Sequence, residues 1–298
     1  MRFEFATAGR IVFGQGSVGE VVDAAPSLGS CCLMVTGKSP HRWNSLIDRL
    51  KNRGVTTHVF KVPGEPSTET VLAGVSAARE HRCDCVIAVG GGSVIDSAKF
   101  LSVLLKRGGR TLDLVDKGVP GAGLPCVMVP TTAGTGAEST PNAIVAVREK
   151  QLKIGVVSPF FMPDHVVLDP ELTVGLPPEL TASTGVDALC HVLECYTSKK
   201  ANPHSDTVAL AGIKLIDGAI RRAYADGSDI GARADMLLGS FYGGLSIAAS
   251  GTTAVHALSY PLGGKYRIPH GTANAILLVP VMDFNRDAAA EKLARVAE

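Results

Sequence analysis

The chain has 298 residues, enough for two domains that each bury a core of their own. Lys and Arg number 29 and Asp and Glu 28, so no strong field favours nucleic acid or an anionic membrane as a partner. With 46% hydrophobic residues and 33 glycines, the composition favours a compact α/β protein that binds a small molecule.

The sequence does not predict an export signal or a membrane-spanning segment. Its first residues lack a basic region followed by an apolar stretch, and its most apolar segment, residues 273–282, is too short to cross a bilayer. The seven cysteines are odd in number and form no Cys-x-x-Cys pair, which argues against a disulfide lattice. We therefore expect reduced cysteines in a cytoplasmic protein.

Short β-rich runs alternate with helical segments in the first half of the chain. Amphipathic helices are expected at 40–53 and 68–80. Strands are expected at 10–13, 32–36, 57–61, 85–89, 126–129 and 165–168. This alternation predicts a mostly parallel sheet in an α/β domain over residues 1–175, with ligands at the carboxyl ends of the strands.

The second half is almost entirely helical in pattern. Residues 174–178 resemble a connector, and helices are expected at 179–198, 205–225, 233–260 and 271–282, with a break at 261–264. A last helical pattern starts at Asp287 and has neither a glycine cap nor a following proline. We therefore expect an all-α domain over residues 176–298.

A glycine turn follows the strand at 85–89. Gly90, Gly91 and Gly92 would let backbone N–H groups approach a phosphate, and the helix that follows adds its positive end. Ser93 is expected to cap that helix, with Asp96 as the reciprocal partner. The usual dinucleotide fingerprint would need a glycine where Ile95 stands, so a tight structural turn remains the alternative.

A second polar turn, residues 130–138, follows the strand at 126–129. It offers the hydroxyl groups of Thr131, Thr132 and Thr135 at the same edge of the expected sheet. Two such turns favour a dinucleotide, with several phosphate and ribose groups, over a simple phosphate.

Four residues of the helical half could hold one divalent metal ion. Asp187 and His191 are four apart on an expected helix and share a face. His256 is expected late in a helix at 252–260, and His270 just before the helix at 271–282. A carboxylate with imidazoles suits Fe(II), Zn(II), Co(II) or Mn(II). Spacing alone leaves a helix hydrogen bond and ordinary core histidines as equal alternatives.

Four motifs, in a fixed order along the chain, resemble those of a known enzyme family. They are GGGSVIDSAK at 90–99, PTTAGTGAE at 130–138, TGVDALCHVLE at 184–194, and VHALSYPLGG with IPHG within 255–271. With these motifs the chain resembles the iron-dependent (group III) alcohol dehydrogenases. The resemblance implies an N-terminal nucleotide-binding domain, a C-terminal helical domain and a metal in the cleft between them.

The resemblance also implies roles for individual residues. The metal ligands would be Asp187, His191, His256 and His270. The cofactor would be contacted by the pyrophosphate-binding turn Gly90, Gly91, Gly92 and Ser93, by Asp96, and by Thr131, Thr132, Thr135 and Lys153, while Asn142 would face nicotinamide or substrate. The implied cofactors are Fe(II), with Zn(II) as the alternative, and NAD or NADP.

The chain departs from the family pattern at several places. Tyr260 stands where many members have a second histidine, so a phenol or water would relay the alcohol proton. Gly37 replaces an Asp that repels a 2′-phosphate, which makes NADP acceptable. Ile247 replaces an aromatic residue of the pocket. Family members continue beyond residue 298, which implies a helical domain shortened at its C-terminus.

The expected function is metal-dependent hydride transfer between NAD(P) and a small alcohol, aldehyde or hydroxy acid. Tyr260 keeps open a hydroxyacid–oxoacid transhydrogenase, in which the cofactor stays bound. A lyase or cyclase of the dehydroquinate-synthase type is disfavoured, because that group prefers a Glu/His/His metal set. A nucleotide- or metal-binding relic without turnover is the non-enzymatic alternative. The expected partner is an alcohol or carbonyl substrate, and a homo-oligomer is left open.

Overall fold

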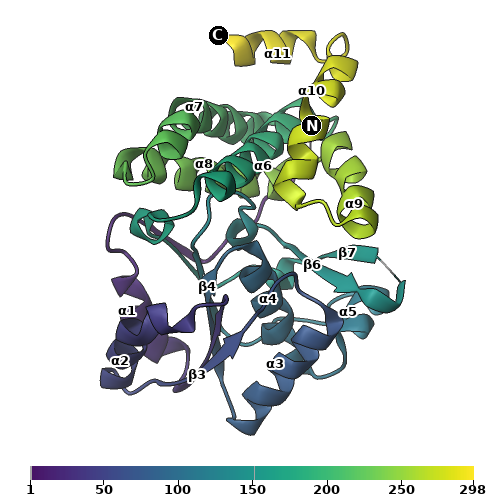
Figure 1. The fold of residues 1–298 in the computed structure, drawn as a ribbon. Coiled ribbons are helices and arrows are strands. Elements are labelled where there is room, and N and C mark those ends of the chain that lie inside the picture. The colour runs from purple at the N-terminus through teal and green to yellow at the C-terminus, as the bar shows by residue number, and fades with distance from the viewer. Residues whose placement is uncertain (1, 151) are drawn as a thin grey trace. The chain divides into compact units, whose positions relative to one another are not determined.

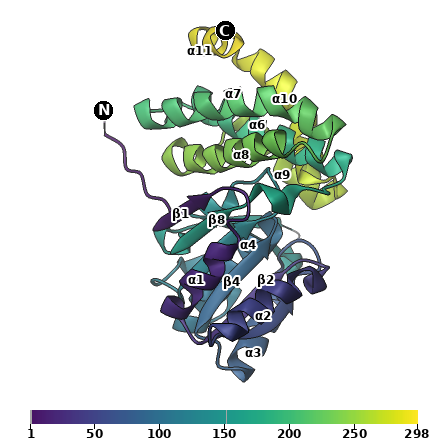
Figure 2. The ribbon, with the colours of Figure 1, turned by 90° about the vertical axis from the view of Figure 1, so that its left-hand side faces the viewer.

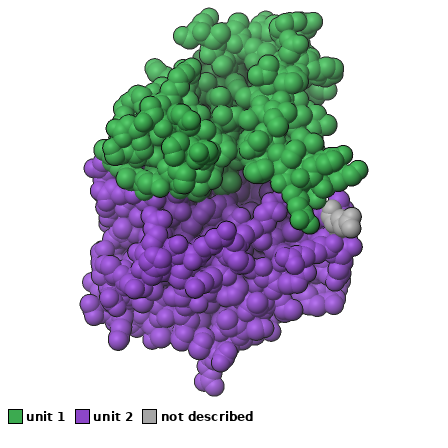
Figure 3. All heavy atoms as spheres, in the orientation of Figure 1, with its two compact units in different colours: residues 1–6, 132–136, 173–298 green, residues 7–131, 137–172 purple. Residues whose placement is uncertain are grey.

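The computed structural model describes residues 2–150 and 152–298 (Figure 1). The chain divides into two compact units, which Figure 3 colours separately. The sheet unit comprises residues 7–131 and 137–172. The helical unit comprises residues 173–298, the short segment 132–136 and the N-terminal residues as far as Ala6. The expected domains, 1–175 and 176–298, did not anticipate the last two segments, and their boundaries stay a prediction.

The sheet unit is built on a six-stranded parallel sheet. Its order is β1 (Arg10–Phe13), β8 (His165–Leu168), β5 (Cys126–Pro130), β4 (Cys85–Gly90), β2 (Cys31–Thr36) and β3 (Thr56–Lys61). All six expected strands are confirmed, with ends shifted by at most one residue. The reason is that β-branched and apolar runs suit a sheet whose central strands are buried on both faces.

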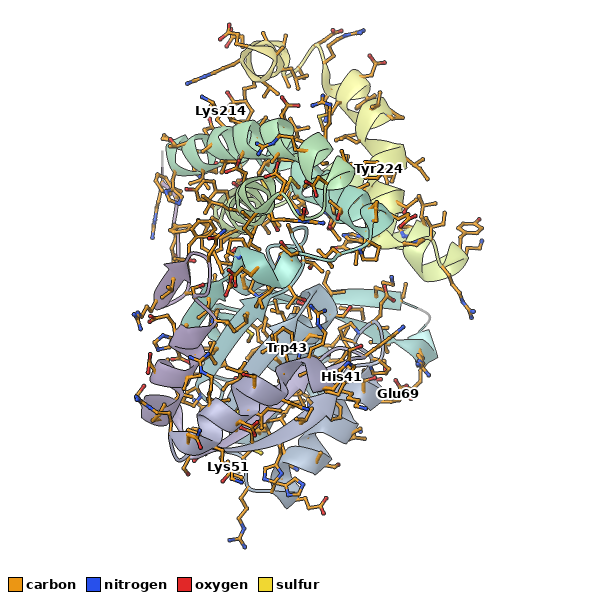
Figure 4. The ribbon with its side chains drawn as sticks, turned by 60° about the vertical axis from the view of Figure 1, so that its left-hand side comes forward. His41, Trp43, Lys51, Glu69, Lys214 and Tyr224 are labelled. Atoms are coloured by element: carbon orange, nitrogen blue, oxygen red, sulfur yellow. The ribbon has the colours of Figure 1, made fainter. Side chains whose placement is uncertain are left out.

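Helices cover this sheet and bury its apolar side chains. One core joins α1 (Gly19–Leu28) and α2 (Asn44–Asn52) to the strands, and it includes Trp43, which is labelled in Figure 4. The helix α3 (Thr68–Glu80) packs against α4 (Gly92–Arg107), which in turn packs against β4. The short helix α5 (Thr111–Lys117) was not expected.

A two-stranded antiparallel hairpin was also missed. It pairs β6 (Asn142–Val147) with β7 (Leu152–Val157) and stands apart from the main sheet. Burial alternates along β6, whereas Leu152 and Val157 of β7 are exposed. A strand with exposed apolar residues gives a weaker sequence signal than a strand with a clean alternation of polar and apolar residues.

The glycine turn starts its helix earlier than expected. Gly91 is the N-cap of α4 and makes no side-chain cap bond, so the expected cap at Ser93 and its partner Asp96 are wrong. The carboxylate of Asp96 instead accepts the backbone N–H of Ile144 in β6. Gly90 is required because a Cβ there would lie 2.5 Å from the side chain of Val94.

The helical unit contains α6 (Pro178–Thr197), α7 (Pro203–Ala225), α8 (Ile230–Ser250), α9 (Ala254–Tyr266), α10 (His270–Asn285) and α11 (Ala290–Ala297). Asn202 caps α7 and Asp229 caps α8 through bonds to backbone N–H groups. Figure 2 shows α7 and α8 side by side, and a Cβ at Gly239 of α8 would lie 2.6 Å from Ile216 of α7.

Two predictions for this half are wrong. The expected helix at 233–260 is two helices, because Gly251, with a φ of 75°, caps the C-terminus of α8. The expected break at 261–264 lies inside α9, which instead ends at Arg267 in the left-handed conformation. His256 is therefore the third residue of its helix and not a late one.

Within the described ranges, no helix is long and apolar enough to cross a membrane. The seven cysteines are all free thiols.

Candidate metal centre

Three helices of the helical unit bring the four predicted ligands together. Asp187 and His191 project from one face of α6, His256 is the third residue of α9, and His270 is the first residue of α10. One donor atom from each lies within 4.8 Å of the other three. Asp187, His191 and His256 are at most 4% exposed, and the side chain of His270 is about one-third exposed at 32%.

The spacing of the donor atoms fits a single ion. The Nε2 atoms of His191, His256 and His270 lie 3.9, 3.6 and 3.5 Å from Oδ1 of Asp187. Ligands placed tetrahedrally at about 2.1 Å from a metal lie about 3.4 Å from one another. A carboxylate with three imidazoles is also a donor set suited to Fe(II) or Zn(II).

Two of the histidines are held in the tautomer that a metal requires. Nδ1–H of His191 donates to the carbonyl oxygen of Gly134 at 3.2 Å. Nδ1–H of His256 donates to the carboxylate of Glu194, which is fully buried. In the neutral ring, a proton on Nδ1 leaves the lone pair on Nε2, so each of these two histidines would offer Nε2 to an ion at the centre of the group.

Asn274 directs its amide into the same space from α10. Its Nδ2 donates to Oδ1 of Asp187 at 2.6 Å and lies 3.1 and 3.3 Å from Nε2 of His256 and His270. Its Oδ1 is buried and has no hydrogen-bond partner in the described part of the chain. A buried amide oxygen without a partner is unusual in a folded protein, and it fits a site that binds a further group.

The charges around the centre favour a cation. Burial raises the pKa of Asp187, but the neighbouring His191, His256 and His270 outweigh it and hold that pKa well below the usual range. Burial lowers the pKa of His191 to about 4 despite Asp187. Burial also opposes the charging of His256, but its bonds to Asp187 and Glu194 raise its pKa to about 9. Two buried carboxylates thus draw positive charge to this point.

Close backbone packing fixes the elements that carry the ligands. A Cβ at Gly271, next to His270, would lie 2.2 Å from the carbonyl oxygen of Ser183 in α6. A Cβ at Gly134 would lie 2.7 Å from Cβ of Thr184. Only glycine allows these approaches, so α10 and the 132–136 segment are both held against α6.

Tyr260 lies one turn after His256 on α9. Its ring centroid is 6.3 Å from that of His270, with an interplanar angle of 13°, and the residue is 37% exposed. The structure therefore places a phenol beside one predicted ligand, where many relatives were expected to carry a histidine.

Several predicted cofactor residues meet at one edge of the sheet unit. Gly37, Gly91 and Thr131 directly follow β2, β4 and β5, which are adjacent and parallel, so all three lie at the carboxyl edge. The N–H of Thr131 donates to the carbonyl oxygen of Gly90 at 3.0 Å. The α4 N-terminus, with Gly92 and Ser93 in its first turn, opens at the same edge. Such an edge is where open parallel sheets bind ligands.

The other predicted cofactor residues lie elsewhere. Asn142 begins β6, Lys153 on β7 forms an ion pair with Glu65, and Asp96 bonds to β6 as described above. Thr132 and Thr135 belong to the segment that packs in the helical unit. The role of each in cofactor binding stays a prediction.

A buried lysine that was not singled out from the sequence braces the second polar turn. Nζ of Lys99 on α4 donates to the carbonyl oxygens of Ala137, Thr140 and Asn142 at 2.6–2.7 Å. Glu138 is 2% exposed and its Oε1 has no hydrogen-bond partner among the described residues. Burial raises the pKa of Glu138 to about 7 and lowers the pKa of Lys99 to about 8.

Comparison with known proteins identifies the family. The profile of the iron-containing alcohol dehydrogenases matches residues 8–170, and that of the C-terminal region of the Fe-containing alcohol dehydrogenase family matches residues 181–298. The long-chain-alcohol dehydrogenase 1 of Geobacillus thermodenitrificans is 38% identical to this chain over an aligned length of 302 residues. The alignment covers 96% of this chain and 76% of that protein.

Comparison with solved structures supports the same family. A 1,3-propanediol oxidoreductase superposes with a TM-score of 0.96 at 33% identity, covering 100% of this chain and 79% of the other. The sulfoacetaldehyde reductase of Bifidobacterium kashiwanohense, solved in complex with NAD⁺, superposes with a TM-score of 0.89 at 32% identity, covering 96% and 77%. The fold predicted from the sequence is confirmed by these neighbours. The chain belongs to the iron-containing alcohol dehydrogenases and is an oxidoreductase of that type.

Proposed function

We propose that the protein transfers a hydride between NAD(P) and a small alcohol or aldehyde, with Fe(II) or Zn(II) held by Asp187, His191, His256 and His270. The observation that carries the proposal is the convergence of these four donor atoms within 4.8 Å. When bound there, the metal would supply Lewis acidity to an alcohol or carbonyl oxygen. Because similar proteins are named for different alcohols and aldehydes, we propose a substrate class and no single substrate.

The residues of the helical unit would prepare the site in advance. Gly134 and Glu194 fix the tautomers of His191 and His256, so little reorganisation is needed before Nε2 can bind. Burial of Asp187, His191 and His256 limits the access of water to the group and strengthens its electrostatic interactions. Tyr260 is our candidate for moving a proton to or from the substrate, since its ring lies beside His270.

The sheet unit would hold the dinucleotide. The pyrophosphate would bind the N–H groups of Gly91, Gly92 and Ser93, where no side chain caps α4. Thr131, Thr132, Thr135, Asn142 and Lys153 remain proposed contacts with the remainder of the cofactor. Gly37 would allow either NAD or NADP, because glycine offers no carboxylate that would repel a 2′-phosphate.

Three finer points belong to the same proposal. We favour Fe(II) as the native metal on the family match and Zn(II) as its substitute. Seven free cysteines suit a reducing compartment, and we propose the cytoplasm. We also retain residues 1–175 and 176–298 as the two evolutionary domains.

The test begins with metal-free protein. Loading it with Fe(II) or Zn(II) should restore NAD(P)H formation, followed by absorbance, over a panel of alcohols. The variant Asp187→Asn should bind metal and support turnover far more weakly than the unsubstituted protein. Absence of turnover with every metal and alcohol would refute the proposal. Tight NAD(P)H binding without single-turnover hydride transfer would instead favour a binding relic, and exchange between two substrates without free cofactor would favour a transhydrogenase.

A further inference from the structure

A carboxylate that the sequence did not single out lies directly behind the proposed metal ligands. Glu194 is on α6, three residues after His191 and seven after Asp187, and it is fully buried. Burying an ionised carboxylate is costly unless several donors bond to it. Each of its two oxygens has a distinct set of partners, and these partners suggest its role.

One oxygen holds the start of α9. Oε1 accepts the backbone N–H of Thr253 at 2.9 Å, the hydroxyl of Thr253 at 2.8 Å and the backbone N–H of Val255 at 2.8 Å. Thr253 is the N-cap residue of α9 and makes no side-chain cap bond within its own helix. A carboxylate from α6 therefore satisfies these N–H groups and opposes the positive end of the helix.

The other oxygen holds the imidazole of His256. Oε2 accepts Nδ1–H of this ring, whose Nε2 lies 3.6 Å from Oδ1 of Asp187. One side chain thus fixes both the backbone position of the first turn of α9 and the tautomer of the histidine on that turn. Both oxygens of Glu194 therefore accept bonds, Oε1 from two N–H groups and a hydroxyl and Oε2 from Nδ1–H, which is the bonding pattern of a carboxylate.

We propose that Glu194 is a positioning residue of the metal centre, which acts through His256 and completes a carboxylate–histidine–metal arrangement. This inference rests on the proposed function, since it requires the four residues to bind an ion. Residues in such positions alter metal affinity by about 10- to 100-fold when they are replaced.

Glu194→Gln gives a test with little change of shape. The amide keeps one oxygen, which is better placed at Oε1, where two N–H groups and a hydroxyl converge. Its NH₂ group then faces Nδ1 of His256, and a donor there opposes Nδ1–H. The ring is driven to carry its proton on Nε2, which removes the lone pair from the metal side.

The experiment measures Zn²⁺ affinity of the full chain by competition with a chelating dye. It also follows the Nδ1–H resonances of the zinc-loaded protein by NMR with ¹⁵N-labelled histidine. Glu194→Gln should bind Zn²⁺ about 10- to 100-fold more weakly and lose the Nδ1–H signal of His256. The matched control is Glu179→Gln, the same exchange at an exposed position of α6, which should leave both readouts unchanged.

A second control separates positioning from helix capping. Thr253→Val removes one donor to Oε1 but leaves the bond to His256, so it should lower the melting temperature without weakening Zn²⁺ binding. Unchanged affinity in Glu194→Gln, or equal losses in Glu194→Gln and Thr253→Val, would overturn the inference and leave the proposed function standing. Failure of the unsubstituted protein to bind Zn²⁺ would overturn both.

Discussion

The contact between Gly271 and Ser183 gives the sharpest test of how the metal centre is held. In Gly271→Ala the new Cβ would lie 2.2 Å from the carbonyl oxygen of Ser183 and 2.7 Å from its carbonyl carbon. Carbon–carbon contacts are optimal at about 3.5–4.0 Å, so the backbone of α10 must move by about 1 Å. The atoms that obstruct the methyl group are mainly backbone, and no side-chain rotation relieves them.

This movement acts on the residue beside Gly271. His270 begins α10, and its Nε2 lies 3.5 Å from Oδ1 of Asp187. Overpacking of a well-packed interior costs about 1–3 kcal/mol, so the free energy of unfolding should fall by that amount. A metal site tolerates deviations of only about 0.2 Å in its ligand distances, so a shift of about 1 Å at His270 should lower Zn²⁺ affinity by at least about tenfold.

The assay combines a urea titration of the metal-free protein with dye competition for Zn²⁺. The matched control is Gly218→Ala on α7, where a Cβ meets open space and should stabilise the helix by about 0.5–1 kcal/mol. Gly271→Ala with the stability and affinity of the unsubstituted protein would refute the steric argument. Lost stability with unchanged affinity would show that α10 does not set the position of His270.

Three further predictions concern other parts of the molecule. Burial raises the pKa of Glu138 from 4.5 to about 7, so the folded protein binds this proton more tightly than the unfolded chain does. The free energy of unfolding is therefore highest at low pH and falls as the pH rises from about 4.5 to 7. Glu138→Gln should remove this decrease of about 3 kcal/mol in the free energy of unfolding. Urea titrations of both proteins at pH 5 and 8 measure the decrease. An equal pH dependence in the variant and the unsubstituted protein would contradict the prediction. Gly37→Asp should weaken NADP binding relative to NAD by about tenfold, measured by fluorescence titration, because a carboxylate would repel the 2′-phosphate; an unchanged ratio would remove the argument. Tyr260→Phe should lower kcat about 10²- to 10⁴-fold with unchanged Zn²⁺ affinity if the phenol moves a proton beside His270, and an unchanged kcat would exclude that role.

The strands and the glycine turn could be predicted because their signals are local. β2, β4 and β5 are apolar runs that end where the chain turns, and parallel pairing then places Gly37, Gly91 and Thr131 at one edge. The cap of α4 could not be predicted in the same way. Ser93 has the usual capping side chain, but the glycines before it adopt the helix start without one.

The convergence of the four predicted ligands could not be predicted from their sequence spacing alone. Asp187 and His191 share a face of α6 by helical periodicity alone. The positions of His256 and His270 depend on where α9 and α10 begin, and the sequence pattern predicted one helix over 233–260 and missed the break at Gly251. Glu194 has a partial signal, since it is a carboxylate on an otherwise buried face one turn after His191.

The bond between Gly134 and His191 has a consequence for how this protein can be divided. The segment 132–136 interrupts the sheet unit in sequence, yet it packs with the helices and orients a proposed ligand. A gene fragment that encodes only residues 173–298 would therefore contain all four proposed ligands but would lack the carbonyl group that sets the tautomer of His191. The proposed metal centre therefore cannot be transferred with residues 173–298 alone. An exchange of helical halves between relatives would have to include the loop after β5.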